Sequence, residues 1–99
     1  MSSRKDWTPD EIQEVWEKGT PVQGYDKTVY RKDGCGAWMK RDQYGSRALK
    51  LGLGWEIHHV DGNPQNNAPS NRAPLQWENN ASGSCVVTAS GNNNVPVGK

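Results

Sequence analysis

The sequence contains no phenylalanine, and aliphatic residues are scarce. Ile, Leu and Val account for 14 of its 99 residues, below the roughly 20% that usually separates folded from disordered chains. Disorder of this kind also needs a high net charge, and here the net charge is only +1. Five tryptophans and three tyrosines are left to form the core, because each aromatic side chain can bury about 150–250 Å². We therefore expect one small domain with an aromatic core.

Long hydrophobic runs and cysteine pairs are also missing. No apolar run approaches the roughly 18–20 residues that cross a bilayer, and the basic residues 1–7 are not followed by the apolar stretch of a signal peptide. Two cysteines, Cys35 and Cys85, are too few for a disulfide framework and form no CxxC pair. We expect a cytoplasmic protein without a membrane partner, in which Cys35 is a small buried residue. A phage or mobile-element origin is compatible with such a chain.

The first half of the sequence predicts a helix followed by a hairpin. Residues 8–11 combine an N-cap threonine, a proline at the first helical position and a capping-box glutamate, which predicts a helix over 8–19. Residues 28–32 and 37–40 have the composition of short strands. The glycine-rich residues 33–36 between them predict a turn, and hence a β-hairpin.

The second half alternates between polar loops and short ordered segments. Residues 41–50 are basic with weak helical character, and 56–60 predict a strand. The Asn-, Pro- and Gly-containing residues 61–70 predict a loop, and 75–80 predict the start of a helix. Residues 81–99 contain no Trp, Tyr, Leu or Ile. We expect them to form a flexible tail with nothing to bury, after a domain that spans the first 80 residues.

Basic residues are concentrated in the middle of the chain. Residues 21–50 contain seven basic and three acidic residues. Such a segment can hold a phosphate backbone, although it is also compatible with a solvated hairpin surface. The candidate nucleic-acid-binding residues are Arg31, Lys32, Lys40, Arg41, Arg47 and Lys50.

The only two histidines are adjacent and are followed by many asparagines. On a strand, His58 and His59 point to opposite faces, so one can turn to a metal while the other meets a water or a substrate. Two partly exposed histidines at a strand end would look the same. However, residues 61–80 contain six asparagines, more than turn formation alone requires. The pattern indicates an organised polar site.

This part of the chain resembles the HNH endonucleases, His-Me finger proteins with a ββα-metal fold. The residues that carry the resemblance are 54–64, Asn67, Asn71 and 75–80, with 30–36 and 44–45 similar to the upstream hairpin of one branch of that family. The resemblance implies an α+β fold: a small single domain whose ββα-metal motif, at about 54–80, follows an N-terminal helix and a β-hairpin.

The resemblance also implies roles for individual side chains. It places His58 at the first metal-ligand position and His59 at the general base. Asn71 falls on the middle residue of the motif, whose side chain pins the loop between the two strands and so orients the base. Asn80 falls on the second metal ligand, and Asn79 is the alternative because the register is ambiguous by one residue.

These roles suit the hydrolysis of a phosphodiester bond. A neutral imidazole can accept a proton from the attacking water at physiological pH, and one divalent cation stabilises the charge that develops on the phosphate oxygens. The expected substrate is double-stranded DNA, cut to 5′-phosphate and 3′-hydroxyl ends.

The sequence leaves alternatives open for the identity of the metal and for catalytic activity. Because His58 stands where relatives often have Asp, both protein ligands are neutral, which favours Mn²⁺, Ni²⁺ or Co²⁺ over Mg²⁺. Zn²⁺ is a structural or inhibitory alternative. Residues 81–84 also lack the lysine that relatives often place there. A catalytically silent HNH-fold DNA-binding module, or a structural metal-binding or protein-interaction domain, is therefore an alternative to the enzyme.

Overall fold

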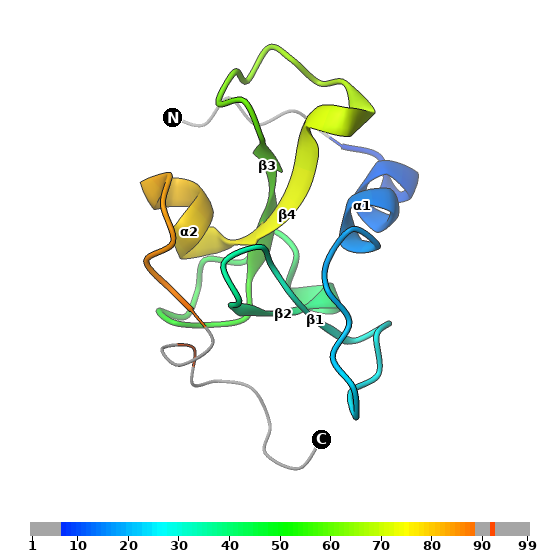
Figure 1. The fold of residues 1–99 in the computed structure, drawn as a ribbon, viewed down its shortest axis with the longest axis vertical. Coiled ribbons are helices and arrows are strands. Elements are labelled where there is room, and N and C mark those ends of the chain that lie inside the picture. The colour runs from blue at the N-terminus through cyan, green and yellow to red at the C-terminus, as the bar shows by residue number, and fades with distance from the viewer. Residues whose placement is uncertain (1–6, 89–91, 93–99) are drawn as a thin grey trace.

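The computed structural model describes residues 7–88 and residue 92. It is a small α+β fold of two helices and two antiparallel two-stranded sheets. The elements in chain order are α1 (Pro9–Trp16), β1 (Tyr30–Lys32), β2 (Trp38–Lys40), β3 (Trp55–His59), β4 (Arg72–Gln76) and α2 (Trp77–Ser82), with 3₁₀ turns at Arg41–Gln43 and Pro69–Asn71. The α+β class is thus confirmed. Helices α1 and α2 lie on either side of the β3–β4 pair (Figure 1).

Helix α1 begins where the sequence predicts. The hydroxyl of Thr8 accepts a hydrogen bond from the Glu11 backbone N–H at 3.2 Å, and the Glu11 carboxylate accepts one from the Thr8 backbone N–H at 2.9 Å. This reciprocal pair is the expected capping box. The helix ends at Trp16, with Glu17 as C-cap, and is therefore shorter than the 8–19 span.

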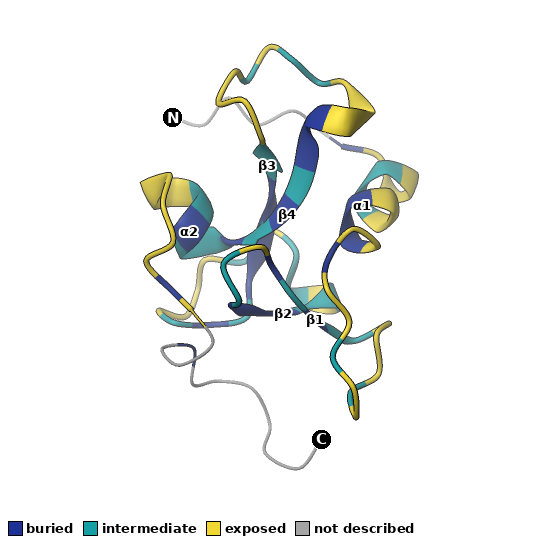
Figure 2. Ribbon diagram, viewed as in Figure 1, coloured by how far each residue is buried: buried dark blue, intermediate teal, exposed yellow. Residues whose placement is uncertain are grey.

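The core is aromatic, as expected. Its buried members are Trp7, Val15, Trp16, Met39, Trp55 and Ile57. The rings of Trp16 and Trp55 lie 5.2 Å apart between centroids, and both side chains are almost completely buried. The burial lies along β3 and β4 and on the inner faces of the helices (Figure 2). Within the described residues, no helix has the length and apolar character needed to cross a membrane.

Strands β3 and β4 pair from Trp55↔Gln76 to His59↔Arg72. The first confirms the strand predicted at 56–60, displaced by one residue. The second lies where no strand was predicted, and it contains Pro74, a residue that is rare in a central strand. In a two-stranded sheet both strands are edges, where proline is tolerated.

Helix α2 starts later than the sequence predicts. The expectation of a helix over 75–80 is wrong at its first two residues, because Leu75 and Gln76 pair with β3. The side-chain oxygen of Gln76 then accepts hydrogen bonds from the backbone N–H groups of Glu78 and Asn79. Gln76 thus ends the strand and caps the helix.

The cysteines form a disulfide, which corrects the expectation that Cys35 is simply a small buried residue; it is half-buried. Cys35 in the hairpin turn is bonded to Cys85 after α2, with their Cα atoms 5.4 Å apart. They are 50 positions apart in the sequence, a separation that gives no spacing signal. Disulfides are typical of oxidising compartments, so cysteine usage does not support a cytoplasmic location.

The segment after α2 is anchored, so the expected tail beginning at residue 81 is also wrong. Residues 81 and 82 belong to α2, and Val87 is 2% exposed. The Asn79 side chain accepts a hydrogen bond from the Val87 N–H at 2.7 Å and donates one to the Val87 carbonyl at 2.9 Å. Asn92 likewise accepts from the Trp38 N–H. Polar pairing holds this segment where apolar residues are few; residues 89–91 and 93–99 lie outside the described residues.

Candidate functional site

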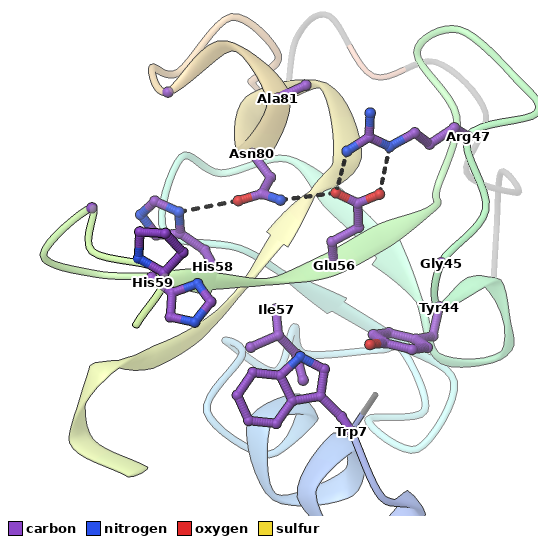
Figure 3. Close-up of a pocket in the computed structure, with 13 residues that line it drawn as sticks. Trp7, Tyr44, Gly45, Arg47, Glu56, Ile57, His58, His59, Asn80 and Ala81 are labelled. Carbon is purple, nitrogen blue, oxygen red and sulfur yellow. Dashed lines mark hydrogen bonds and ion pairs between the residues drawn. The ribbon is translucent and has the colours of Figure 1, made fainter. Parts of the chain in front are cut away.

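A pocket of about 820 Å³ opens beside β3 and α2. His58, His59 and Asn80 line it together with Glu56, and Arg47 closes one side. Figure 3 shows His58, Asn80, Glu56 and Arg47 linked on one side of β3, with the His59 ring on the other side of the strand. The structure thus brings together both histidines and one of the two asparagines that the sequence offered.

Asn80, and not Asn79, faces His58. The Asn80 Oδ1 atom lies 3.1 Å from His58 Nδ1, and its Nδ2 donates to Glu56 Oε1 at 2.8 Å. An ionised carboxylate can only accept hydrogen bonds, so Glu56 fixes the amide with its oxygen toward His58. Asn79 is fully buried and its amide bonds to Asp33 and to the Val87 carbonyl instead.

Glu56 is the site residue that the sequence reasoning missed. It is 4% exposed, and its carboxylate forms a two-point ion pair with Arg47 at 2.5 and 2.7 Å. The hydrogen bonds that Arg47 donates to Glu56 raise the pKa of the Arg47 guanidinium, against a smaller opposing effect of burial, and the negative charge of Glu56 adds to the rise. A signal was present, since Glu56 and His58 are two residues apart on a strand and so share one face.

His59 is held on the other face of β3. Its Nε2 lies 2.8 Å from Asn67 Oδ1, and its ring centroid is 6.1 Å from that of Trp7. Neither contact was predicted. Asn67 was one of six similar asparagines, and Trp7 lies 52 positions earlier in the chain.

Asn71 ties the loop between β3 and β4 at its base. Its Oδ1 accepts from the Asp61 N–H at 2.9 Å, while its Nδ2 donates to Asp61 Oδ1 at 2.9 Å and to the Asn66 carbonyl at 2.8 Å. Hydrogen bonds from the Asn66 side chain, the Asn63 backbone and the Asn71 side chain lower the pKa of Asp61. The expected pinning of the loop is present, but the side chain of this loop that hydrogen-bonds to the His59 ring is Asn67.

Arg31 does not fit its predicted role as a phosphate contact. It is 8% exposed, and its guanidinium donates to the backbone carbonyls of Lys27, Glu17 and Gly19 at 2.9 to 3.1 Å. These bonds join the hairpin to the end of α1. Arg31 is therefore a structural residue, hidden from a nucleic acid by burial that its position in a short strand did not reveal.

The other basic candidates lie on the hairpin and the loop that follows it. The ammonium of Lys32 sits 4.8 Å from the centroid of the Trp38 ring, Lys40 is 4.0 Å from Asp42, and Arg41 donates to the Gln13 side chain at 3.0 Å. Lys50 is exposed. Of the six candidates, Arg47 is the one that lines the pocket as far as the described residues go.

The donor atoms fit a cation held by two protein ligands. Atoms that bind one ion at about 2.0–2.2 Å lie about 3 Å apart when they are neighbours in its coordination shell, close to the 3.1 Å between His58 Nδ1 and Asn80 Oδ1. Across residues 7–88 and 92, no cluster of three or more His, Cys, Asp and Glu side chains has metal-site geometry. Water and substrate oxygens would therefore complete the coordination.

Comparison with protein-family models, with curated proteins and with solved structures gives no match to this chain.

Proposed function

We propose that the protein is a metal-dependent endonuclease of the HNH type that hydrolyses double-stranded DNA. The observation that carries the proposal is the pairing of His58 with Asn80 across β3 and α2, with His59 beside them in the same open pocket. The strand–strand–helix order of β3, β4 and α2 supports the ββα-metal assignment.

His58 and Asn80 would hold the cation, and His59 would act as the general base. A divalent cation at this position supplies Lewis-acid stabilisation of the charge on the phosphate and the leaving oxygen. His59 takes the proton from the attacking water, which an imidazole does well near neutral pH. Glu56 fixes the ligand amide from behind. The products carry a 5′-phosphate and a 3′-hydroxyl.

The neutral ligands favour a transition metal over Mg²⁺. Imidazole binds Mn²⁺, Co²⁺ and Ni²⁺ better than it binds the hard Mg²⁺ ion. The carboxylate of Glu56 adds negative charge one hydrogen bond away from Asn80, although Arg47 compensates for it. We expect cleavage in Mn²⁺, Co²⁺ or Ni²⁺ to exceed cleavage in Mg²⁺, and Zn²⁺ to bind without supporting turnover.

Plasmid cleavage tests the proposal directly. Wild type and His59→Ala are incubated with supercoiled DNA in EDTA and in each of Mg²⁺, Mn²⁺, Co²⁺, Ni²⁺ and Zn²⁺. Wild type should nick and linearise the plasmid only with metal, and His59→Ala should be slower by about 10²–10⁴-fold while still binding DNA. Cleavage in EDTA, or by His59→Ala at the wild-type rate, would contradict the mechanism.

A catalytically silent DNA-binding module is the second candidate. This candidate is favoured by the shortage of positive charge near the reacting phosphate. Arg47 is paired with Glu56, and residues 81–84 contain no lysine that could contact the phosphate. DNA binding that weakens with salt, without cleavage in any of the five metals, would support this candidate over the enzyme.

A further inference from the structure

We propose that Asn67 is a positioning residue that holds His59 with its proton on Nε2 and leaves Nδ1 free to accept a proton. The effect on catalysis rests on the proposed function, whereas the position of the proton rests on the hydrogen bond alone. His59 Nε2 and Asn67 Oδ1 lie 2.8 Å apart. An amide oxygen only accepts, and a neutral imidazole carries one N–H. That N–H must therefore be on Nε2, with the lone pair of Nδ1 left for the water.

Asn67 is itself held in place by a charged neighbour. The guanidinium of Arg72 donates to the Asn67 backbone carbonyl from Nε at 3.1 Å and from Nη2 at 2.9 Å. Arg72 is 8% exposed and is the β4 residue that pairs with His59. The backbone that carries the Asn67 side chain is thus fixed by a residue of the strand next to β3.

Trp7 closes a ring of contacts around the imidazole. The Arg72 guanidinium carbon lies 4.8 Å from the centroid of a Trp7 ring, and Trp7 in turn lies against His59. His59, Asn67, Arg72 and Trp7 therefore form a closed circuit, which we call the imidazole cage. Rotation of the His59 ring would break the contact with Asn67 and displace the ring from Trp7.

The charge within the imidazole cage is balanced at its outer edge. Arg72 lies 3.3 Å from Glu14 and 3.6 Å from Glu11, both on α1. The first turns of α1 therefore neutralise the cation that holds Asn67. This pairing explains why a buried arginine can stand beside an imidazole that has to accept a proton.

His58 provides an internal comparison. Its Nδ1 faces Asn80 Oδ1, so by the same logic the metal-free protein carries the His58 proton on Nδ1. The two adjacent histidines should have opposite tautomers. Metal binding at His58 Nδ1 would move that proton to Nε2, whereas His59 would keep its Nε2 proton.

Long-range ¹H–¹⁵N NMR of the full chain in EDTA tests the assignment. At about pH 8.5, where imidazole is ordinarily neutral, we expect a hydrogen-bonded Nε2–H resonance for His59 and an Nδ1–H tautomer for His58. An Nδ1–H tautomer at His59 would overturn the proposal. This readout needs no DNA and no metal, so it holds or fails independently of nuclease activity.

Three variants separate positioning from a general effect on the loop. Asn67→Ala removes the acceptor; we expect it to lose the His59 Nε2–H resonance and to slow cleavage at least about 10-fold. Asn67→Asp keeps an acceptor oxygen and should retain both the resonance and cleavage within about 3-fold of wild type. Asn63→Ala, in which another loop amide is removed, is the matched control and should behave as wild type.

Comparison of Asn67→Ala with Asn67→Asp also shows which result would contradict the proposal. If Asn67→Ala keeps the resonance, or cleaves DNA as fast as Asn67→Asp, then Asn67 does not position His59. If wild type shows the expected resonance but no cleavage in any metal, the proposed function fails while the assignment of the proton stands.

Discussion

The two faces of α2 make opposite use of the same side chain. Asn79 is completely buried and bonds to Asp33 and to both backbone groups of Val87. Asn80, the next residue, turns into the open pocket between Glu56 and His58. One asparagine holds the helix to the hairpin turn, and the other offers its oxygen to the site. Burial and partners, and not residue type, separate the structural face from the functional face.

Asp33 anchors the structural face. Its carboxylate is 3% exposed and accepts four hydrogen bonds, from the N–H groups of Cys35, Ala37 and Gln76 and from the Asn79 amide. A buried charge is tolerated when it is fully hydrogen-bonded. The hairpin turn is thus joined to the junction of β4 and α2, which sets where Asn80 emerges.

Removal of the disulfide should have the largest effect on stability. For a closed loop of 50 residues, the chain-entropy model gives about 4 kcal/mol, so Cys35→Ser/Cys85→Ser should unfold at much lower urea concentration than wild type. Because the disulfide lies on the structural face of α2, we expect the variant still to cleave DNA at a temperature where it is folded. Dithiothreitol should destabilise wild type and leave the double variant unchanged; equal unfolding midpoints without reductant would contradict the role of the cross-link.

Replacement of Asn79 should lower stability, whereas replacement of Asn80 should mainly weaken metal binding. Asn79→Ala leaves the Asp33 carboxylate and the Val87 backbone short of partners, and we expect a loss of about 3 kcal/mol in the free energy of unfolding. Asn80→Ala should cost less than about 1 kcal/mol but abolish Mn²⁺ binding in calorimetry. Similar losses of stability in both variants would remove the distinction between the faces.

Glu56→Gln should weaken the site while keeping its shape. A glutamine can either accept or donate, so it no longer fixes the Asn80 amide, and the negative charge is lost. Partners of metal ligands typically contribute about 10–100-fold in affinity, and we expect the Kd for Mn²⁺ to rise at least about 10-fold. Glu17→Gln, a charge removed from the end of α1, is the control. An unchanged Kd in Glu56→Gln would show that Asn80 is oriented without it.

The smallest expected effect is a loss of stability of the loop between β3 and β4 at acidic pH. The pKa of Asp61 is lowered from its ordinary 3.8 by the Asn66, Asn63 and Asn71 hydrogen bonds. The carboxylate therefore stabilises the loop above its unfolded-state pKa, and this contribution is lost as the pH falls through the lower folded-state value. NMR signals of the Asn71 side-chain amide should shift below about pH 4 and stay constant above it. A transition nearer neutral pH would indicate another group.

Local signals in the sequence predicted the elements, and contacts between distant segments accounted for the errors. The capping box at Thr8 and the strand at His58 depend on neighbouring residues, and both are present. The meeting of His58 with Asn80 was expected only from a resemblance. The Cys35–Cys85 bond, the burial of Arg31 and the packing of Val87 each depend on partners at least eight residues away. Periodicity and composition do not encode such contacts.

The disulfide also changes the topology of the chain. Cys35 and Cys85 close a covalent ring that contains both histidines and Asn80, while Trp7 lies outside it. One proteolytic cut in the exposed part of the loop between β3 and β4 would leave His58 and Asn80 on different pieces that remain covalently joined. The two halves of the site would then separate only after a reductant opened the ring.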